Sequence, residues 1–585
     1  MLLLVAELTR WLTRPTGPSG LSRVRCDRLM QESTRELQME NELPHACGSH
    51  SHGRQRPRAG KTAAWSLVRA VSPQLWQKGV LARLLVPVAL ALVLVSRLVW
   101  IGRPVLLPDE AYYWDWSRRL DLGYFDHPPL VALVIRTTTM IAGTSEFTVR
   151  VGMAMLGVGT AALAYRAGVL LSGRLAGWLC LLATATCPLF VLLSGFAAPD
   201  GPLLFLWAAT VYALLRAVVT GCGRYWYAAG ILLGLALLAK YVAVLLIPSI
   251  LLFVSTSRRG WLRRREPYLA CALALLVFSP NVWWNLRHGW VSMSFQLAHG
   301  ACQAGSSPSN HLRAVGVYAV TQVAIVGPLL ALALVVATAV ALVRGVRQRQ
   351  DVALLLVCCT LPTSILFLAV QGLAHWAAPA YFSAIICASV FLARVLRRAA
   401  GWQRALLIIF CVATLLSLAF ESTSIVRAVV SSAPMPGPLG QMIAPTLMEP
   451  GLGWRDVGRG VGAVLTRLPS ADHRSTPVLA DSYGTAAEVA FYAPTRPHVY
   501  SGSNQYRMWG SPEPSATVLF IGNAGAPVPV AHLRRSDARV ANALTVRSAG
   551  RVVRRLELMV MSRPAALEDL LAAAWRAAAT RCEGS

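Results

Sequence analysis

Long apolar runs, separated by short arginine-rich connections, fill most of the chain from about residue 80 to 421 and constrain its fold more than any other feature. A helix needs about 20 apolar residues to cross about 30 Å of hydrocarbon, and several runs reach that length. The runs cover 82–101, 147–171, 175–195, 199–219, 225–239, 241–256, 268–284, 313–343, 352–370, 374–394 and 402–421. They predict an all-α polytopic membrane domain over residues 79–425, with about 11–13 transmembrane helices.

The composition excludes a soluble protein, because 55% of the residues are hydrophobic and only 14% are charged. The net charge of +28 could suggest nucleic acid. Many basic residues, however, lie in short clusters between apolar runs, and no nucleic-acid recognition motif accompanies them. We therefore expect the lipid bilayer as a partner and no nucleic acid. The twelve cysteines form no CxxC pair, and most lie inside apolar runs as small buried residues.

The arginine-rich connections predict the orientation in the membrane. They contain Arg258, Arg259, Arg263, Arg264 and Arg265; Arg344, Arg347 and Arg349; and Arg394, Arg397, Arg398 and Arg404. The alternate connections, such as 196–199 and 371–376, contain no Lys or Arg. The positive-inside rule places the arginines in the cytoplasm, so that 103–146, Asp200, 285–312, His375 and everything after about 422 lie outside. We expect a multi-pass protein of the inner (cell) membrane with a cytoplasmic N-terminus and a periplasmic C-terminal domain.

The two ends of the chain differ from the apolar centre. Residues 1–78 are polar and basic, and they predict a disordered cytoplasmic extension. Residues 435–585 predict a small extracytoplasmic α/β domain, with a helix over 565–580. Short alternating runs predict its strands, at 477–480, 488–492, 516–521 and 554–560. We see no internal repeat.

Acidic and aromatic residues gather in the outer segment 103–146, which we predict to be a catalytic loop. It contains Asp109, Glu110, Tyr112, Tyr113, Trp114, Asp115, Trp116, Asp126 and His127, followed by Pro128 and Pro129. Acids and aromatics beside a spanning helix can be interfacial charge and an aromatic belt. The combination of paired acids with a rigid Pro-Pro turn favours a site, because carboxylates near a low-dielectric boundary can be tuned as general bases.

A second set of polar residues is expected on the same face. Asp200 is either a helix cap or a second carboxylate facing Asp109. Lys240 interrupts an apolar run and either snorkels to the interface or binds a lipid phosphate. An outer-face pocket is predicted from Trp284, Asn285, His288, His375 and Trp376. Each histidine alone is more often structural, and no spacing among these residues requires a metal.

Several motifs in order resemble bacterial polyprenyl-phosphate-dependent glycosyltransferases with the GT-C fold. These enzymes include glycosyltransferase family 39, the protein O-mannosyltransferases, and the aminoarabinose transferases of lipid A. The motifs are Asp109-Glu-Ala-Tyr-Tyr113, Tyr124-Phe-Asp-His-Pro-Pro129, Pro199-Asp200, Gly234-Leu-Ala-Leu-Leu-Ala-Lys240, His375-Trp376, Tyr483-Gly-Thr-Ala-Ala-Glu488 and Asn504-Gln-Tyr-Arg-Met-Trp509. The resemblance covers residues from about 80 to 510.

The resemblance implies a sugar donor linked to polyprenyl phosphate and an extracytoplasmic acceptor: lipopolysaccharide or lipid A, another glycan, or protein. It implies inverting transfer with Asp109, beside Glu110, as the base on the acceptor hydroxyl. The donor lipid phosphate would be held by Lys240, His127, Tyr112 and Tyr113, with Asp200 and Asp126 as further carboxylates.

Two departures from the aminoarabinose transferases remove cations. Those enzymes have Arg where this chain has Tyr112, and Lys where it has His127. The missing charge would come from Lys240 or from a divalent metal held by Asp109, Asp200 and His375; no cofactor is otherwise implied. A transporter or flippase, or a non-catalytic binder of lipid-linked sugars, is the alternative. A transporter would have polar residues through the midplane and related halves, and the sequence has neither feature.

Overall fold

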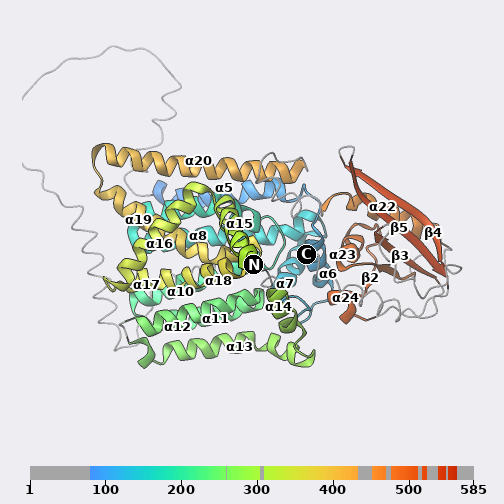
Figure 1. The fold of residues 1–585 in the computed structure, drawn as a ribbon, viewed down its shortest axis with the longest axis horizontal. Helices are drawn as coiled ribbons and strands as arrows, with labels where there is room; N and C mark the ends of the chain where they lie inside the picture. The colour runs from blue at the N-terminus through green and yellow to red at the C-terminus, as the bar shows by residue number, and fades with distance from the viewer. Residues whose placement is uncertain are drawn as a thin grey trace, which may run out of the picture.

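The computed structural model describes residues 80–257, 260–302, 308–431, 451–468, 476–510, 517–523, 538–548 and 551–562. These residues form a helical bundle up to residue 431 and a smaller domain with a sheet from residue 451, joined end to end (Figure 1). The predicted extension over 1–78 and the predicted helix over 565–580 lie outside the described residues.

The bundle is built of α-helices, and several of them are long and apolar enough to make the chain a multi-pass membrane protein. In order they are Val80–Ile101 (α5), Pro108–Arg118 (α6), Leu130–Ala142 (α7), Glu146–Thr186 (α8), Pro188–Leu193 (α9), Asp200–Thr220 (α10), Arg224–Ala239 (α11), Leu246–Thr256 (α12), Glu266–Arg287 (α13), Val291–Cys302 (α14), Pro308–Val326 (α15), Pro328–Val346 (α16), Asp351–Cys358 (α17), Leu361–Val370 (α18), Ala378–Arg398 (α19) and Gly401–Ser431 (α20), with 3₁₀ turns at Tyr241–Leu245 (η1), Trp261–Arg263 (η2) and Ala374–Ala377 (η3). Within the described residues, eight helices could span a membrane and four shorter ones are apolar. The predicted number of about 11–13 transmembrane helices is reached only when the eight long helices and the four shorter ones are counted together.

Two breaks in the bundle explain where the expected spans and the observed helices differ. Helix α8 runs through the connection expected between two spans, but it kinks at Ser172 and Gly173, where Gly173 has φ 74°. The single run expected over 313–343 is two helices, because Gly327 adopts φ 95° immediately before Pro328. Glycine tolerates positive φ, and proline at the first position of a helix has no N–H that needs a partner.

The segment 103–146 was expected to be a loop, but much of it is helical. Helix α6 begins at Pro108 and buries one residue after another from Glu110 to Ser117, and helix α7 packs against α6 and α8. An 11-residue helix is marginal in water, and packing on all sides stabilises it here. Asp109, Glu110 and Asp115 are therefore held on a helix, whereas Asp126 lies in the connection between α6 and α7.

The C-terminal domain is a five-stranded mixed sheet with helices, as predicted. The strands are Val478–Ala480 (β1), Val499–Ser501 (β2), Thr517–Asn523 (β3), Ala538–Ser548 (β4) and Arg551–Ser562 (β5), in the order β2-β1-β3-β5-β4. Strand β1 pairs in parallel with β2 and β3, and β5 pairs antiparallel with β3 and β4. The helices are Trp454–Leu465 (α22), Tyr483–Tyr492 (α23) and Asn504–Met508 (α24).

The predicted strand over 488–492 is wrong, because these residues end helix α23. The hydroxyl of Ser482 caps that helix by accepting a hydrogen bond from the N–H of Thr485. Ala486, Ala487 and Ala490 favour helix, and the apparent alternation is the buried face of α23. Figure 1 shows α23 between the sheet and α6, and the two helices are in contact.

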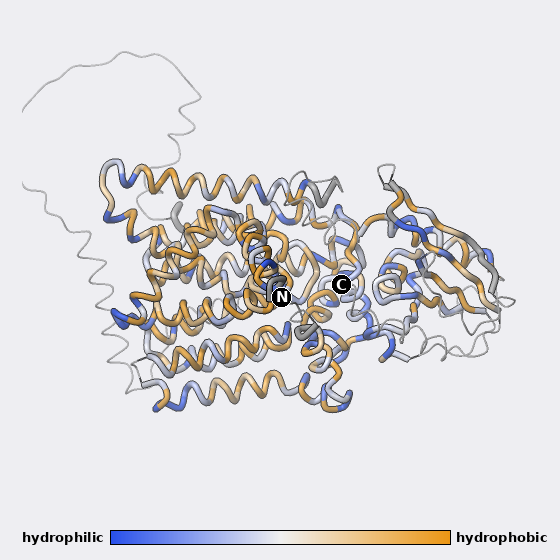
Figure 2. Tube along the Cα trace, in the orientation of Figure 1, coloured by the Kyte–Doolittle hydropathy of each residue, from blue (hydrophilic) through white to orange (hydrophobic). Residues whose placement is uncertain are grey.

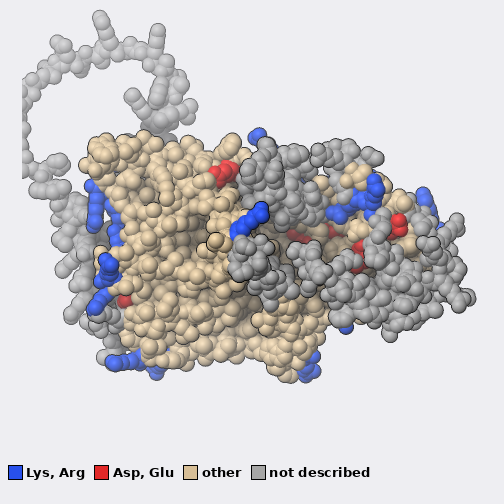
Figure 3. Space-filling model, viewed as in Figure 1, with Lys and Arg blue, Asp and Glu red and all other residues tan. Residues whose placement is uncertain are grey.

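Hydropathy and charge follow the division of the molecule. Hydrophobic residues dominate the bundle helices in Figure 2. Lys and Arg gather at the end of the bundle away from the sheet, on the left of Figure 3. This end holds the last turns of α16 and α19, with Arg344, Arg397 and Arg398. The connections expected in the cytoplasm and the C-terminal domain thus lie at opposite ends of the bundle.

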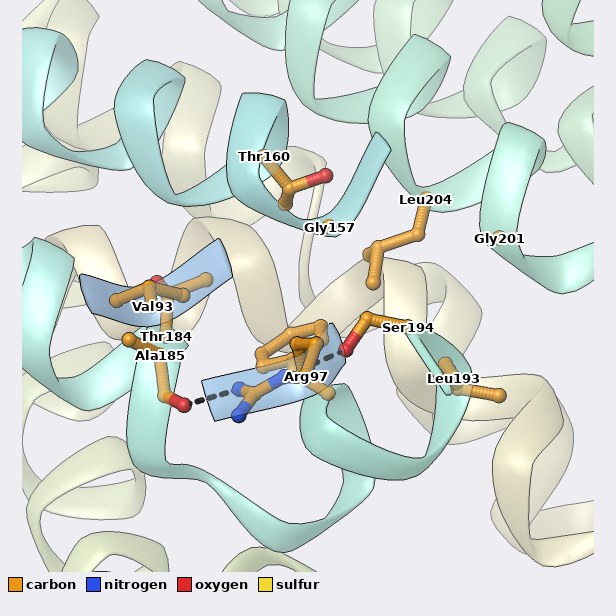
Figure 4. A pocket seen from close by; sticks show the side chains of 11 residues that line it. Val93, Arg97, Gly157, Thr160, Thr184, Ala185, Leu193, Ser194, Gly201 and Leu204 are labelled. Atoms are coloured by element: carbon orange, nitrogen blue, oxygen red, sulfur yellow. Dashed lines mark hydrogen bonds between the residues drawn. The ribbon is translucent and has the colours of Figure 1, made fainter. Parts of the chain in front are cut away.

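A buried arginine, Arg97, lies within the first long helix. Arg97 of α5 donates from Nε to Ser194 Oγ (3.0 Å) and from Nη2 to the carbonyl oxygen of Ala185 (2.5 Å), beside a cavity of about 10 Å³ (Figure 4). A charged side chain in a span normally faces the bundle and bonds to polar groups there. Arg97 thereby joins α5 to the chain around the break between α8 and α9.

Candidate active site

A cavity of about 500 Å³ lies between the bundle and the C-terminal domain. Its wall contains ten of the residues predicted for the site: Asp109, Glu110, Tyr112, Tyr113, Asp126, His127, Asp200, Lys240, His375 and Trp376. They come from α6, the segment before α7, the start of α10, the break after α11, and η3. Segments separated by more than 200 residues therefore meet at one cavity, as the orientation argument from the sequence required.

The first turn of α6 positions the paired acids. The backbone N–H of Leu107 donates to Glu110 Oε2 (3.0 Å), and Pro108 is the first helical residue. Acidic side chains are favourable at a helix N-terminus, where unpaired N–H groups carry partial positive charge. Asp109 and Glu110 are neighbours on this turn and so point in different directions, which gives them different surroundings.

Glu110 forms a buried ion pair with Arg150 of α8. Arg150 Nε donates to Oε1 (2.7 Å) and Nη2 to Oε2 (2.5 Å), while the N–H of Ala197 also donates to Oε1 (2.8 Å). The remaining N–H groups of Arg150 donate to the carbonyl oxygens of Ile101, Pro104 and Val105. Both oxygens of the Glu110 carboxylate are thus engaged by protein donors, so its geometry differs from that expected of a catalytic acid.

Asp109 differs from Glu110 because its side chain is exposed to the cavity. Its Oδ1 accepts a hydrogen bond from the hydroxyl of Tyr483 (3.0 Å), the first residue of α23. The low-polarity surroundings raise the pKa of the Asp109 carboxyl above its ordinary value. The Tyr483 hydrogen bond opposes this rise, the charge of Glu110 adds to it, and Lys240 opposes it. Asp109 is therefore an acid of the cavity wall whose charged form is disfavoured by its surroundings.

Asp126 is a second titratable acid of the wall. Its Oδ1 accepts from Asn504 Nδ2 (3.3 Å), and its Oδ2 is buried without a partner among the described residues. Burial raises the pKa of Asp126 to about 7, the phenol of Tyr112 lowers it, and the charge of Asp109 raises it. The charge of Asp109 therefore disfavours the charged form of Asp126.

Asp200 and Lys240 form a buried pair across the cavity wall. Lys240 Nζ lies 2.9 Å from Oδ1 and 2.8 Å from Oδ2 of Asp200, and His375 Nε2 lies 3.8 Å from Oδ2. Lys240 is extended (φ −159°, ψ 139°) where α11 ends and η1 begins, and its Nζ is 5.9 Å from the ring centre of Trp376. The lysine neither snorkels alone nor lies unpaired. An ammonium group has three N–H donors, and Asp200 engages two of them.

The predicted metal ligands are not arranged as a metal site. Within the described residues, no group of three or more His, Cys, Asp or Glu side chains could hold a metal ion. Asp200 is bound to Lys240, and Asp109 is bound to Tyr483. These contacts do not fit a divalent cation.

Three residues predicted for an outer-face pocket do not line the cavity. Trp284 Nε1 donates to Asp121 Oδ2 (2.8 Å), Asn285 is buried against Asn281 and Tyr241, and the His288 ring stacks on Trp284. All three lie at the end of α13, where Trp284 bonds to the segment that follows α6 and Asn285 bonds to η1. Their polar and aromatic character reflects this packing.

Residues of the C-terminal domain complete the wall in a way that the sequence did not predict. Tyr483 and Asn504 both line the cavity. The hydroxyl of Tyr112, expected near the donor phosphate, accepts from the N–H of Gln505 (2.9 Å), and its ring packs on Tyr483 at 4.8 Å between ring centres. Arg150 was also missed, since nothing near it in the sequence marks its partner. The motifs 483–488 and 504–509 were the only signals for the contribution of the C-terminal domain.

The fold is that of a polytopic membrane protein with a cavity below a C-terminal sheet domain. The described architecture matches the crystal structures of ArnT from Cupriavidus metallidurans, in the apo state (TM-score 0.55, 16% identity, 83% of this chain and 99% of that one) and bound to undecaprenyl phosphate (TM-score 0.53, 15% identity, 82% and 98%). At these identities the likeness concerns the fold.

Sequence comparison adds a family and a relative. Residues 126–284 match the family of dolichyl-phosphate-mannose-protein mannosyltransferases. The chain is 30% identical over 292 residues to the lipid A galacturonosyltransferase RgtD of Rhizobium johnstonii. The aligned region covers 48% of this chain and 59% of that protein. The chain thus spans about three fifths of the length of this relative. The predicted resemblance to this group of GT-C proteins is confirmed.

Proposed function

We propose that the protein is an inverting glycosyltransferase that moves a sugar from a polyprenyl-phosphate donor to an acceptor outside the cytoplasm. The observation that carries this proposal is the meeting of the acid Asp109 and the cation Lys240 at one cavity. Glycosyl transfer from a lipid phosphate needs a base for the attacking hydroxyl and positive charge for the leaving phosphate, and both are present.

The reaction follows from these two groups. The acceptor hydroxyl attacks the anomeric carbon and gives its proton to Asp109. A new carbon–oxygen bond forms on one face of the sugar while the bond to the phosphate oxygen breaks on the other, so the anomeric configuration inverts. The bonding electrons leave with the lipid phosphate. The third N–H of Lys240, together with His127 in the same wall, would stabilise that charge.

The apolar part of the wall supports a lipid donor. Leu189, Leu192, Leu193, Phe196, Ile325, Leu373 and Ile425 line the cavity on the bundle side, next to the buried pair. A polyprenyl chain would lie along these residues with its phosphate toward Lys240. The solved ArnT complex contains undecaprenyl phosphate, which supports a donor of this class. The relative RgtD is named for lipid A, which supports lipid A or lipopolysaccharide as the acceptor.

The orientation belongs to the same proposal. Arg344, Arg397 and Arg398 lie at the end of the bundle opposite the sheet domain. Basic connections face the cytoplasm in most membrane proteins. The cavity and the C-terminal domain would then face the periplasm, where lipid-linked sugars meet their acceptors.

The test uses membranes with the wild type or the Asp109→Asn variant, in which lipid-linked sugars and outer glycans are followed by mass spectrometry. We expect the variant to leave the glycan one sugar short while the polyprenyl-phosphate sugar accumulates, since the base is gone and the cavity keeps its shape. Asp456→Asn, an exposed aspartate of the C-terminal domain, is the matched control and should behave as the wild type. Unchanged pools with stable Asp109→Asn protein would refute catalysis and favour binding or transport.

A further inference from the structure

The hydroxyl of Tyr483 reaches from the C-terminal domain to the acid that we assign as the base. Ser482 caps α23, so Tyr483 occupies the first position of this helix. The Tyr483 hydroxyl donates to Asp109 Oδ1 at 3.0 Å, and the ring packs on Tyr112 of α6. Two residues 374 positions apart thus share one hydrogen bond at the cavity.

We propose that Tyr483 is a positioning residue for Asp109, so that the C-terminal domain completes the catalytic site instead of only covering it. This proposal rests on the proposed function. The hydrogen bond fixes the rotamer of an aspartate whose side chain is exposed to the cavity. With Oδ1 held by Tyr483, the carboxylate can present Oδ2 to the acceptor hydroxyl in one orientation.

The charges around Asp109 show why such a donor is needed. The ionisable groups that act on it or are acted on by it are Glu110, Tyr113, Asp126, Lys240, Tyr483 and Glu488. The charge of Glu110 disfavours the carboxylate form of Asp109, whereas Lys240 and the hydrogen bond from Tyr483 favour it. A hydrogen bond from Tyr483 stabilises the carboxylate, because a hydrogen bond to a charged group is stronger than one between neutral groups. Tyr483 therefore favours the base form of Asp109.

Helix α24 holds the C-terminal domain in the position that this contact requires. Asn504 Nδ2 donates to Asp126 (3.3 Å), the Gln505 side chain accepts from the N–H of Phe125 (2.7 Å), and the Tyr506 hydroxyl donates to Asp115 (2.8 Å). Asn504 has φ 49°, a conformation that asparagine tolerates better than most residues. Consecutive side chains of α24 thus fasten the domain to α6 and to the segment after it.

The test measures the rate of polyprenyl-phosphate release against pH for the full-length protein in detergent. The donor is the lipid-linked sugar fraction extracted from cells that carry Asp109→Asn, and the acceptor is the glycan from the same cells. Tyr483→Phe removes the hydroxyl and keeps the ring on Tyr112. We expect it to lower the rate at pH 7 by at least tenfold and to move the acid limb of the profile to higher pH, because the pKa of Asp109 rises when its donor is lost.

Tyr492→Phe is the matched control. Its hydroxyl also joins the two parts of the protein, through Leu106 and Glu146, but it does not line the cavity. It should leave the acid limb in place even if the protein becomes less stable. A Tyr483→Phe profile that superimposes on the wild type, while Asp109→Asn is inactive, would overturn the role of Tyr483 alone. Full activity of Asp109→Asn would overturn the proposed function and this proposal with it.

Discussion

Replacing Arg150 by methionine tests how the site is built. Arg150 neutralises the Glu110 carboxylate and donates to three backbone carbonyl groups of the chain before α6. Both side chains are almost fully buried, at 0% and 2% exposure. In the variant, Glu110 keeps the N–H groups of Leu107 and Ala197 as donors but loses its counter-charge.

The expected magnitude follows from these contacts. Removing one partner of a buried ion pair costs about 3–5 kcal/mol, and each carbonyl left without a donor adds about 1–3 kcal/mol when water cannot reach it. The costs overlap because the chain relaxes around the gap, so we expect Arg150→Met to lower the free energy of unfolding by about 4 kcal/mol. The double variant Glu110→Gln/Arg150→Met has no lone charge and should lose about 2 kcal/mol less.

Unfolding of the purified protein in mixed micelles, followed by tryptophan fluorescence, gives these free energies. Arg459→Met is the matched control, because Arg459 bonds to Asp456 on the surface and should change stability by less than about 0.5 kcal/mol. A loss below about 1 kcal/mol for Arg150→Met would show that the pair behaves as a solvated one. Equal losses in the single and double variants would show that the Glu110 charge is not the source of the cost.

Three other variants test buried charges at the site. Glu488 is fully buried with both carboxylate oxygens unpaired among the described residues, and burial raises its pKa well above the ordinary value. The folded protein favours the neutral form of Glu488, so its stability should fall as the pH rises from the pKa of Glu488 in the unfolded chain toward its pKa in the folded protein. Glu488→Gln should therefore unfold at a higher temperature than the wild type at pH 8 but not at pH 4. Burial raises the pKa of Asp126 to about 7, so the unfolding temperature of Asp126→Asn should change less between pH 4 and 7 than that of the wild type. An unchanged pH dependence would contradict the raised pKa of Asp126. Lys240→Gln leaves Asp200 buried without its cation and should lower the free energy of unfolding by about 3 kcal/mol. In the release assay it should raise the KM for the donor more than the KM for the acceptor. Equal effects on both KM values would indicate a general fold defect.

The membrane architecture could be predicted from the sequence because hydrocarbon imposes a length and a composition on every span. The sequence also predicted that four polar residues converge on one face of the bundle: Asp109, Asp200, Lys240 and His375. The number of membrane crossings between the arginine clusters and each residue determines the face on which that residue lies. Secondary structure could not be predicted from local sequence patterns where tertiary packing determines the conformation. Residues 488–492 alternate like a strand but form the buried face of a helix, and 103–146 reads as a loop although α6 is buried on all sides.

Long-range partners could not be predicted from local sequence. The partner of Glu110 is Arg150, 40 residues away, and the partner of Asp109 is Tyr483 in another domain. Neither contact has a periodicity or a spacing that marks it. Trp284 and His288 show the opposite error, because side chains typical of a binding pocket serve here to hold α13 in place.

The attachment of α23 and α24 to α6 has a consequence for the order of biogenesis. The ribosome makes the bundle walls first and the last wall, with Tyr483 and Asn504, only after α20 has been synthesised. Until that final segment has docked on α6, Asp109 lacks its hydrogen bond from Tyr483. If Tyr483 positions the base as proposed, a chain whose C-terminal domain has not yet docked would have a cavity without an oriented Asp109.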